Sequence, residues 1–179
     1  MCKLRRTMTF DPQPVLKGKL VTLRPLQVDD FDALYTVASD PLIWAQHPAR
    51  NRYQLKSFKK FFRDALDSGG TLVVINNSDD QIIGSSRFHG YDEALSEVEI
   101  GWTFLARVYW GGYYNREIKH LMMQHAFAFV DKVVLLVGPD NIRSQRAVEK
   151  LGGTRVGTRP DGSGLESIVY QFTESMLEE

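Results

Sequence analysis

Apolar and polar residues alternate at positions 19–26, and this period of two predicts a β-strand. We expect further strands at residues 71–75, 81–89 and 97–104. Between the first two strands, apolar residues recur every three or four positions, which predicts amphipathic helices at about 29–38 and 55–66. The turn at 76–80 is rich in residues that hairpins use, so antiparallel pairing is expected there.

The spacing changes from Gly111 onward. Apolar residues then recur at three- and four-residue intervals as far as Phe129, which predicts a helix of four or five turns. Val133–Val137 is apolar throughout, as is typical of a strand buried on both faces. A helix over 141–151, ending at Gly152, and two strands at 153–158 and 166–173 complete the pattern. Hairpins followed by a strand–helix–strand–helix passage predict a mixed sheet, with parallel strands in its second half.

Length and charge narrow the class of protein. The 179 residues fit one domain, 1–179, and residues 1–15 of it are expected to form a poorly ordered lead-in. A chain of this size, with 43% hydrophobic residues, buries a core without metal or disulfide support. The 22 basic and 22 acidic residues cancel, which argues against nucleic acid as a partner. An anionic ligand must therefore be held by local geometry.

The number of cysteines and the length of the apolar stretches indicate the cellular compartment in which the protein is expected. Cys2 is the single cysteine, so no internal disulfide framework is possible and a reducing compartment is expected. No four-ligand zinc pattern occurs, and we expect no metal. The longest apolar stretches are far too short to span a membrane, and the first nine residues lack the apolar segment of a secretory signal. We expect a cytoplasmic protein without a membrane partner.

A glycine pair lies between an apolar strand and the long helix, in the segment Trp110-Gly111-Gly112-Tyr113-Tyr114-Asn115. Helix starts leave backbone N–H groups unpaired and carry a partial positive charge, and glycines let a phosphate approach them closely. Such a junction can cradle a pyrophosphate, but it is also common in ordinary turns. The spacing matches neither a Walker loop nor a dinucleotide fingerprint.

A second segment follows the buried strand and opens the next helix. Asn141 is followed by Ser144 three residues later and then by the string Ala-Val-Glu-Lys-Leu-Gly, which ends at Gly152. Each of these residues has a structural interpretation, since Asn141 or Asp140 can cap the helix, Ser144 can add a second cap contact and Gly152 can end it. These separate roles do not explain why the string from Asn141 to Gly152 comes one strand after a helix that begins with the Gly111-Gly112 pair.

Taken together, these segments resemble the GNAT superfamily of acyl-CoA N-acyltransferases, in the branch similar to RimJ and RimL. The resemblance runs from about Leu16 to Phe172 and covers the strings LKGKLVTLRPL, EIGW, YWGGYYNRE and NIRSQRAVEKLGG. It implies a mixed α/β fold, with a twisted sheet of about seven strands flanked by about four helices. Two central parallel strands, 97–104 and 133–137, would splay apart as a V to admit acetyl-CoA.

The resemblance also implies how the cosubstrate is held. The backbone at the end of the first splayed strand would pair with the pantetheine arm, the glycine turn would hold the pyrophosphate, and the start of the last helix would contact the pantetheine region. The corresponding residues are Thr103, Phe104, Leu105, Trp110, Gly111, Gly112, Tyr113, Tyr114, Asn115, Asn141 and Ser144. The chain departs from the family signature at Val108, where Gln or Arg is usual, and at Tyr113, where Gly or Ala is usual.

Amine acetylation requires a base, because an amine with a pKa near 10 must lose a proton before it attacks a thioester. Strand alternation predicts that Glu97 and Glu99 share one face, with Ile100 and Trp102 on the other. Glu99 matches the base of several family members, although both carboxylates can equally serve to keep a strand solvated. Val148 stands where many members have a tyrosine acid, so Ser144 is the candidate to protonate the thiolate or position the thioester.

The acceptor is less well defined. Trp44 and His47 lie in the loop that forms one wall of the acceptor groove in the family, where His47 can either read substrate charge or simply pack. The sequence favours an N-acetyltransferase that transfers acetyl to a primary amine, on a protein N-terminus or a small molecule, by direct attack in a ternary complex. A catalytically inactive acyl-CoA-binding module is the alternative, and either a monomer or a homodimer is expected.

Overall fold

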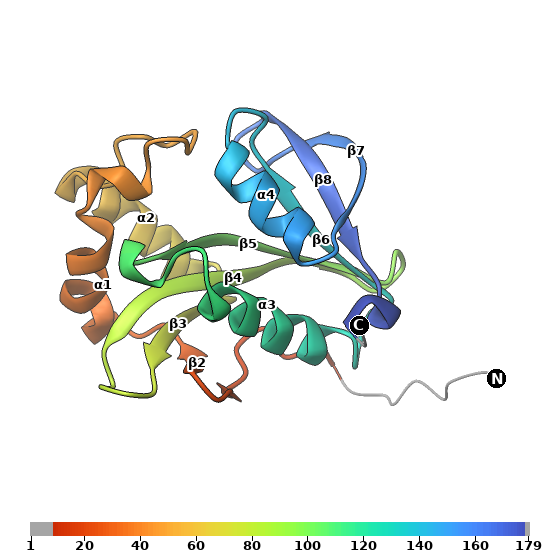
Figure 1. Cartoon of the computed structure of the whole chain (residues 1–179), viewed down its shortest axis with the longest axis horizontal. Coiled ribbons are helices and arrows are strands. Elements are labelled where there is room, and N and C mark those ends of the chain that lie inside the picture. The colour runs from red at the N-terminus through yellow and green to blue at the C-terminus, as the bar shows by residue number, and fades with distance from the viewer. Residues whose placement is uncertain (1–8, 178–179) are drawn as a thin grey trace.

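The computed structural model describes residues 9–177, and within that range eight strands form one sheet in the order β1-β2-β3-β4-β5-β6-β8-β7 (Figure 1). The strands are β1 Leu16–Lys17, β2 Val21–Pro25, β3 Thr71–Asn76, β4 Ile82–Asp92, β5 Glu97–Leu105, β6 Lys132–Val137, β7 Thr154–Pro160 and β8 Glu166–Phe172. The α-helices are α1 Phe31–Ala38, α2 Leu55–Asp67, α3 Tyr113–Ala126 and α4 Ile142–Lys150. Cys2 and the first eight residues of the expected lead-in lie outside the described residues.

The predicted order of strands and helices is confirmed, and β1 is the element that the sequence pattern did not predict. This two-residue strand depends on a distant side chain. The carboxylate of Glu117, in α3, accepts the backbone N–H groups of Lys19, Leu20 and Val21 at 2.7–3.0 Å. These bonds hold the β1–β2 turn against α3, which is why local periodicity gave no sign of β1.

The expected splay between two parallel strands is also confirmed. Parallel pairing of β5 with β6 covers only Glu97↔Lys132, Val98↔Val133 and Glu99↔Val134. Beyond Glu99, β5 continues to Leu105 without a partner on this side, while β6 turns away to pair antiparallel with β8. The two halves of the sheet therefore separate at the middle of β5, as Figure 1 shows.

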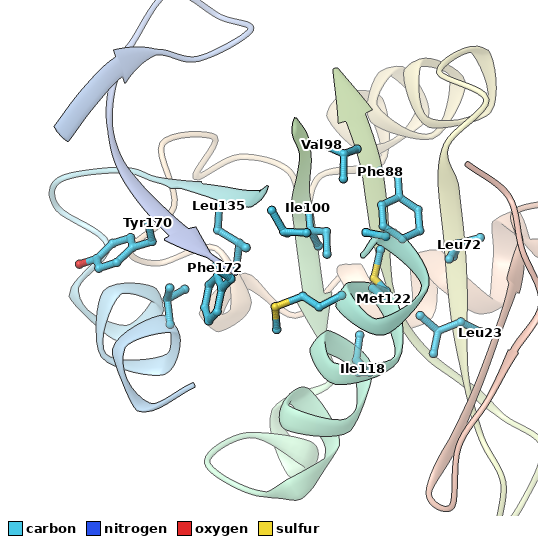
Figure 2. Packing of buried hydrophobic residues seen from close by; sticks show 14 of the residues in the cluster. Leu23, Leu72, Phe88, Val98, Ile100, Ile118, Met122, Leu135, Tyr170 and Phe172 are labelled. Atoms are coloured by element: carbon cyan, nitrogen blue, oxygen red, sulfur yellow. The ribbon is translucent and has the colours of Figure 1, made fainter. Parts of the chain in front are cut away.

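Helices cover both faces of the sheet next to this opening. In one core, Ile118 and Met122 of α3 point toward Leu23, Leu72 and the middle of the sheet (Figure 2). A second core lies between α1, α2 and the other face of β3–β5. Its central residues are Leu34, Ala38, Trp44, Phe58, Phe61, Phe62, Val73 and Phe104. No helix within residues 9–177 combines the length and apolar character that crossing a membrane requires.

A β-bulge in β5 overturns one expectation about the faces of this strand. Ser85 pairs with Phe104 and Arg87 with Gly101, so Ser86 alone stands opposite both Trp102 and Thr103. Trp102 has a φ of +52°, and it packs in the α1/α2 core, whereas Ile100 belongs to the α3 core. The prediction that these two side chains share a face was wrong, because the extra residue reverses the alternation.

Candidate active site

A cleft of about 960 Å³ opens where β5 and β6 separate. Its walls come from β5, β6, the starts of α3 and α4, the loop before α2, α2 itself and the β7–β8 turn. Most of the residues singled out from the sequence line this cleft. They are Glu99, Thr103, Phe104, Leu105, Trp110, Gly111, Asn115, Asn141 and Ser144.

The start of α3 forms one end of the cleft. Gly112 is the N-cap in an extended conformation, and Gly111 has a φ of +72°, where glycine is favoured. A Cβ added at either glycine would meet no atom within 4 Å, so the space in front of the helix is open. The first N–H groups of an α-helix have no partner within the helix, so those at the start of α3 are available to an outside acceptor.

Both departures from the family signature point into solvent. Val108 is 85% exposed and Tyr113 is 77% exposed. Tyr114 points elsewhere, since its hydroxyl donates to Asn76 and its ring lies 4.6 Å from that of Tyr109. Tyr113, which stands where the family usually has a small residue, therefore does not fill the open space before α3.

The free edge of β5 presents backbone N–H and C=O groups to a ligand, because the side chains at this end of the strand are buried or already hydrogen-bonded. Phe104 is buried in the α1/α2 core and Leu105 in the α3 core. The Thr103 hydroxyl accepts a hydrogen bond from Lys119 and lies 2.7 Å from the hydroxyl of Ser86. The indole N–H of Trp110 donates to the Leu105 carbonyl at 3.0 Å and so holds the strand end against the turn.

Asn141 caps α4 through its side chain. Its Oδ1 accepts the backbone N–H of Ser144 at 3.2 Å, and the residue is 6% exposed. The capping role considered for Asn141 is therefore present. Ser144 is half-buried with its side chain along the cleft, opposite β5. Beside it, the Arg143 guanidinium lies 3.9 Å from the centre of the Trp110 ring and donates to the Ile43 carbonyl.

The two carboxylates of β5 differ sharply in their surroundings. Glu97 is 8% exposed and is neutralised by Arg159, at 2.9 Å, and by Lys132, at 3.8 Å. Glu99 is half-buried and forms no hydrogen bond or ion pair within residues 9–177. Burial raises the pKa of Glu99 to about 7, which the charges of Arg159 and Arg87 only partly oppose. A carboxylate with a pKa near 7 is suited to act as a general base at neutral pH, and the Glu99 carboxylate has no ion-pair partner that would occupy it.

His47 carries no charge at neutral pH. Burial, together with the nearby charges of Arg52 and Arg143, lowers its pKa to about 4. Its Nδ1 accepts the N–H of Ala49 at 2.9 Å, which fixes the neutral ring in the Nε2–H tautomer. Trp44 is 2% exposed and donates its indole N–H to Ala38, so it is part of the α1/α2 core as well as of the cleft wall.

The sequence analysis did not identify the cationic residues of the cleft, of which Lys119, Arg52 and Arg87 lie in its interior. Lys119 is 4% exposed, and burial lowers its pKa to about 7. Its spacing gave a usable signal, because it lies four residues after Asn115 and three before Met122, on the inward stripe of α3. Arg52 and Arg87 gave no such signal, since the strand and loop patterns around them do not distinguish an inward arginine from a solvated one.

Within residues 9–177, no group of three or more His, Cys, Asp or Glu side chains is arranged to hold a metal ion. The cleft instead has two chemically different parts. One part is lined by the free edge of β5, the start of α3 and the start of α4, where backbone donors predominate. The other lies over the α1/α2 core, with aromatic and charged side chains. Glu99 lines the cleft at the last parallel pair of β5 and β6, where the free edge of β5 begins.

Comparison with known proteins gives a consistent result. A family model described as an acetyltransferase (GNAT) domain matches residues 21–154. The protein named uncharacterized N-acetyltransferase p20, from Bacillus licheniformis, is 24% identical over 163 residues, covering 86% of this chain and 91% of its own. A structure described as a probable acetyltransferase of the GNAT family from Chromobacterium violaceum has a TM-score of 0.84 at 18% identity, covering 100% of this chain and 96% of its own. Mycobacterium smegmatis RimJ in complex with CoA-disulfide has a TM-score of 0.65 at 19% identity, covering 89% and 84%.

Proposed function

Because this chain belongs to the GNAT acetyltransferases, we propose that it transfers the acetyl group of acetyl-CoA to a primary amine by direct attack in a ternary complex. The observation that carries the proposal is the parallel pairing that stops at Glu99↔Val134. It leaves the second half of β5 with an unpaired edge inside a large cleft, beside a carboxylate that titrates near neutral pH.

The residues of the cleft fit acetyl-CoA. The extended backbone at Thr103, Phe104 and Leu105 can pair with the two amides of a pantetheine arm as an added strand. The N–H groups from Gly111 to Asn115 suit a pyrophosphate, because they begin a 14-residue helix and no side chain fills the space before them. Trp110 shapes this site through its indole bond to Leu105.

Asn141 and Ser144 complete the cosubstrate site from the opposite wall. Because the Asn141 oxygen is used in the helix cap, its amide nitrogen is the donor available to the pantetheine region. The Ser144 hydroxyl can donate a hydrogen bond to sulfur. Bound acetyl-CoA supplies the thioester that the amine attacks.

Glu99 is proposed as the general base. An acceptor amine arrives mostly as an ammonium, and a carboxylate with a pKa of about 7 is matched to accept its proton at neutral pH. Glu97 pairs instead with Arg159 and Lys132, and these ion pairs tie β5 to its neighbours. The departing thiolate takes the proton that the amine nitrogen releases as the amide forms, and the Ser144 hydroxyl is proposed to position the sulfur by donating a hydrogen bond to it. A missing tyrosine at Val148 is then no obstacle.

The experiment combines a thermal shift with a thiol-release assay, using Gly112→Asp and Gly112→Asn as a matched pair. Both side chains suit an N-cap, and a Cβ at this position meets nothing within 4 Å, so both variants should fold. Acetyl-CoA at 100 times its dissociation constant should stabilise the wild type and the Asn variant by about 2.7 kcal/mol. The Asp variant should lose most of this shift, because its carboxylate repels phosphate.

The outcomes separate the two candidate functions. A shift together with thiol release from an amine panel supports the transferase. A shift without release from any amine would favour an acyl-CoA-binding module. A well-folded wild type that acetyl-CoA does not stabilise would overturn the proposed function altogether.

A further inference from the structure

Two arginines in the acceptor part of the cleft have no carboxylate partner, and the proposed chemistry uses neither. Arg87, on β4, is 5% exposed, and Arg52, in the loop before α2, is half-buried. Both line the cleft, and neither forms an ion pair with any residue in the described part of the chain. Burying an unpaired cation is costly, so a purely structural role does not explain this pair.

Aromatic rings surround the two guanidinium groups. The Cζ of Arg52 lies 4.5 Å from the centre of the Phe61 ring and 5.0 Å from that of Trp44, and the Cζ of Arg87 lies 4.6 Å from the centre of the Trp102 ring. These rings hold the cations without neutralising them.

Arg87 also has an unused hydrogen-bond donor. Its Nε donates to the Thr71 hydroxyl at 2.9 Å, but its Nη2 is buried with no hydrogen-bond partner in the described part of the chain. Buried donors are nearly always satisfied in folded proteins, by protein groups, water or a ligand. The other terminal nitrogen, Nη1, also forms no hydrogen bond in the described part of the chain and is not enclosed by protein, so Arg87 can receive an oxygen atom from a ligand in the cleft.

The local charge balance favours an anion. Burial, together with repulsion by Arg87, lowers the pKa of Arg52 to about 10. Asp64 attracts both arginines and Glu99 attracts Arg87, but neither carboxylate forms an ion pair with them. The Asp64 carboxylate is 53% exposed and pairs with Lys60 at 2.8 Å. An anion bound at the two guanidinium groups would relieve their repulsion and provide the missing hydrogen-bond acceptor.

Strand register places Arg87 close to the proposed base. His89 stands opposite Glu99 and Arg87 opposite Gly101, so Arg87 is diagonal to Glu99. Diagonal neighbours on one face of an antiparallel pair are about 7–8 Å apart. Long side chains on both residues can therefore contact two groups of one small molecule, with its amine at Glu99 and its anionic group at Arg87.

On the premise that the proposed amine acetylation is correct, we propose that the acceptor carries its own anionic group, which Arg87 and Arg52 bind while its amine lies against Glu99. Free amino acids are the acceptor class with this chemistry, and aminophosphonates present a comparable anion. The aromatic walls formed by Trp44, Phe61 and Trp102 suit apolar side chains on such an acceptor. A neutral protein N-terminus lacks an anion next to its amine and is the competing acceptor.

The test measures binding, so that it does not depend on turnover. The protein is saturated with CoA and titrated calorimetrically with each amino acid, with the matching amino-acid carboxamide, with aminomethylphosphonate and with a neutral peptide amide. We expect at least one amino acid to bind roughly 100-fold or more tightly than its carboxamide, because the carboxamide leaves the arginines without their anion. Preference for the phosphonate over the amino acids would instead assign the anion as a phosphonate.

Variants separate recognition from folding. Arg87→Gln and Arg52→Gln should remove the preference for the acid over its carboxamide, whereas a purely structural role would weaken both ligands equally. Arg63→Gln is the matched control, because Arg63 is exposed on α2 outside the cleft and the change in charge is the same. If Arg87→Gln loses its fold with the bond to Thr71, Arg52→Gln carries the test.

Two results would overturn the inference. One is equal binding of acids, carboxamides and peptide amides; the other is a panel in which no anionic amine binds to protein that still binds CoA. Either result leaves the proposed acetyl transfer intact, because acetyl-CoA stabilisation and thiol release from neutral amines are measured separately. A failure of acetyl-CoA to stabilise the protein would instead count against the proposed function.

Discussion

Replacing Glu99 by Gln should make the protein more stable and less active, and both effects should depend on pH. The substitution keeps the shape of the side chain and removes its charge. In the folded protein, burial raises the pKa of Glu99 from its ordinary value of 4.5 to about 7. The groups whose charges act on it are Arg159, Asp161, Glu97 and Arg87, and their effects partly cancel.

The sign of the stability effect follows from proton binding. Between pH 4.5 and about 7, the folded state holds a proton on Glu99 that the unfolded state has lost, so the free energy of unfolding falls as the pH rises through this range. Above pH 7 the deficit is constant. A pKa difference of about 2.5 corresponds to about 3.4 kcal/mol. Because the side chain is only half-buried, solvent screening reduces the expected effect to about 2 kcal/mol.

Urea unfolding of both proteins at pH 4.5, 6 and 8 measures this effect. The Gln variant should match the wild type at pH 4.5, once allowance is made for a pH-independent offset, and should gain about 2 kcal/mol over it by pH 8. In a thermal scan at pH 8, this gain corresponds to about 4–8 °C in Tm. A stability difference that stays constant from pH 4.5 to 8 would refute the raised pKa.

Activity provides the second measurement. The wild-type kcat/KM should rise with pH through an inflection near 7 as Glu99 ionises, and the Gln variant should lose this inflection along with roughly 100-fold or more of its activity. Glu97→Gln is the matched control on the same strand, and it should keep the inflection. Full activity in the Glu99 variant would mean that water or another group takes the proton.

Three further predictions concern other positions in the cleft. Lys119→Met should raise the free energy of unfolding by a few kcal/mol at pH 6 and by less at pH 9.5, because burial lowers the Lys119 pKa to about 7 and the folded wild type must bury an ammonium at the lower pH. Urea unfolding at the two pH values measures this, and an equal gain at both would contradict it. Gly101→Ala places a Cβ 3.0 Å from Glu99 Oε1, so kcat should fall while the unfolding midpoint changes little. Steady-state kinetics and a melting curve test this. An unchanged kcat would show that the Glu99 side chain can move away from the new methyl group without loss of activity. Asn141→Ala should cost about 1 kcal/mol of stability and raise the KM for acetyl-CoA. Asn141→Asp should keep the helix cap and raise only the KM. A normal KM in the Asp variant would exclude the amide nitrogen as a cosubstrate contact.

Some features of this protein follow from its sequence alone, because they depend on residues close together in the chain. Periods of two and of three to four residues gave the order of strands and helices, and Asn141 marked the start of α4 as its cap. Both are local effects, since a strand's alternation and a helix's cap are each complete within a few residues. The family signatures are local strings for the same reason.

The tertiary structure decided the properties that give the cleft its chemistry. Local alternation predicted one face for Ile100 and Trp102, but the pairing of β5 with β4 inserts a bulge and separates them. Glu97 and Glu99 look equivalent in sequence, yet Arg159, about sixty residues away, pairs with Glu97, while burial gives Glu99 a pKa of about 7. The unpaired state of Arg52 and Arg87 likewise depends on which distant side chains surround them. Burial and charge depend on contacts between segments far apart in the chain, and no local pattern encodes those contacts.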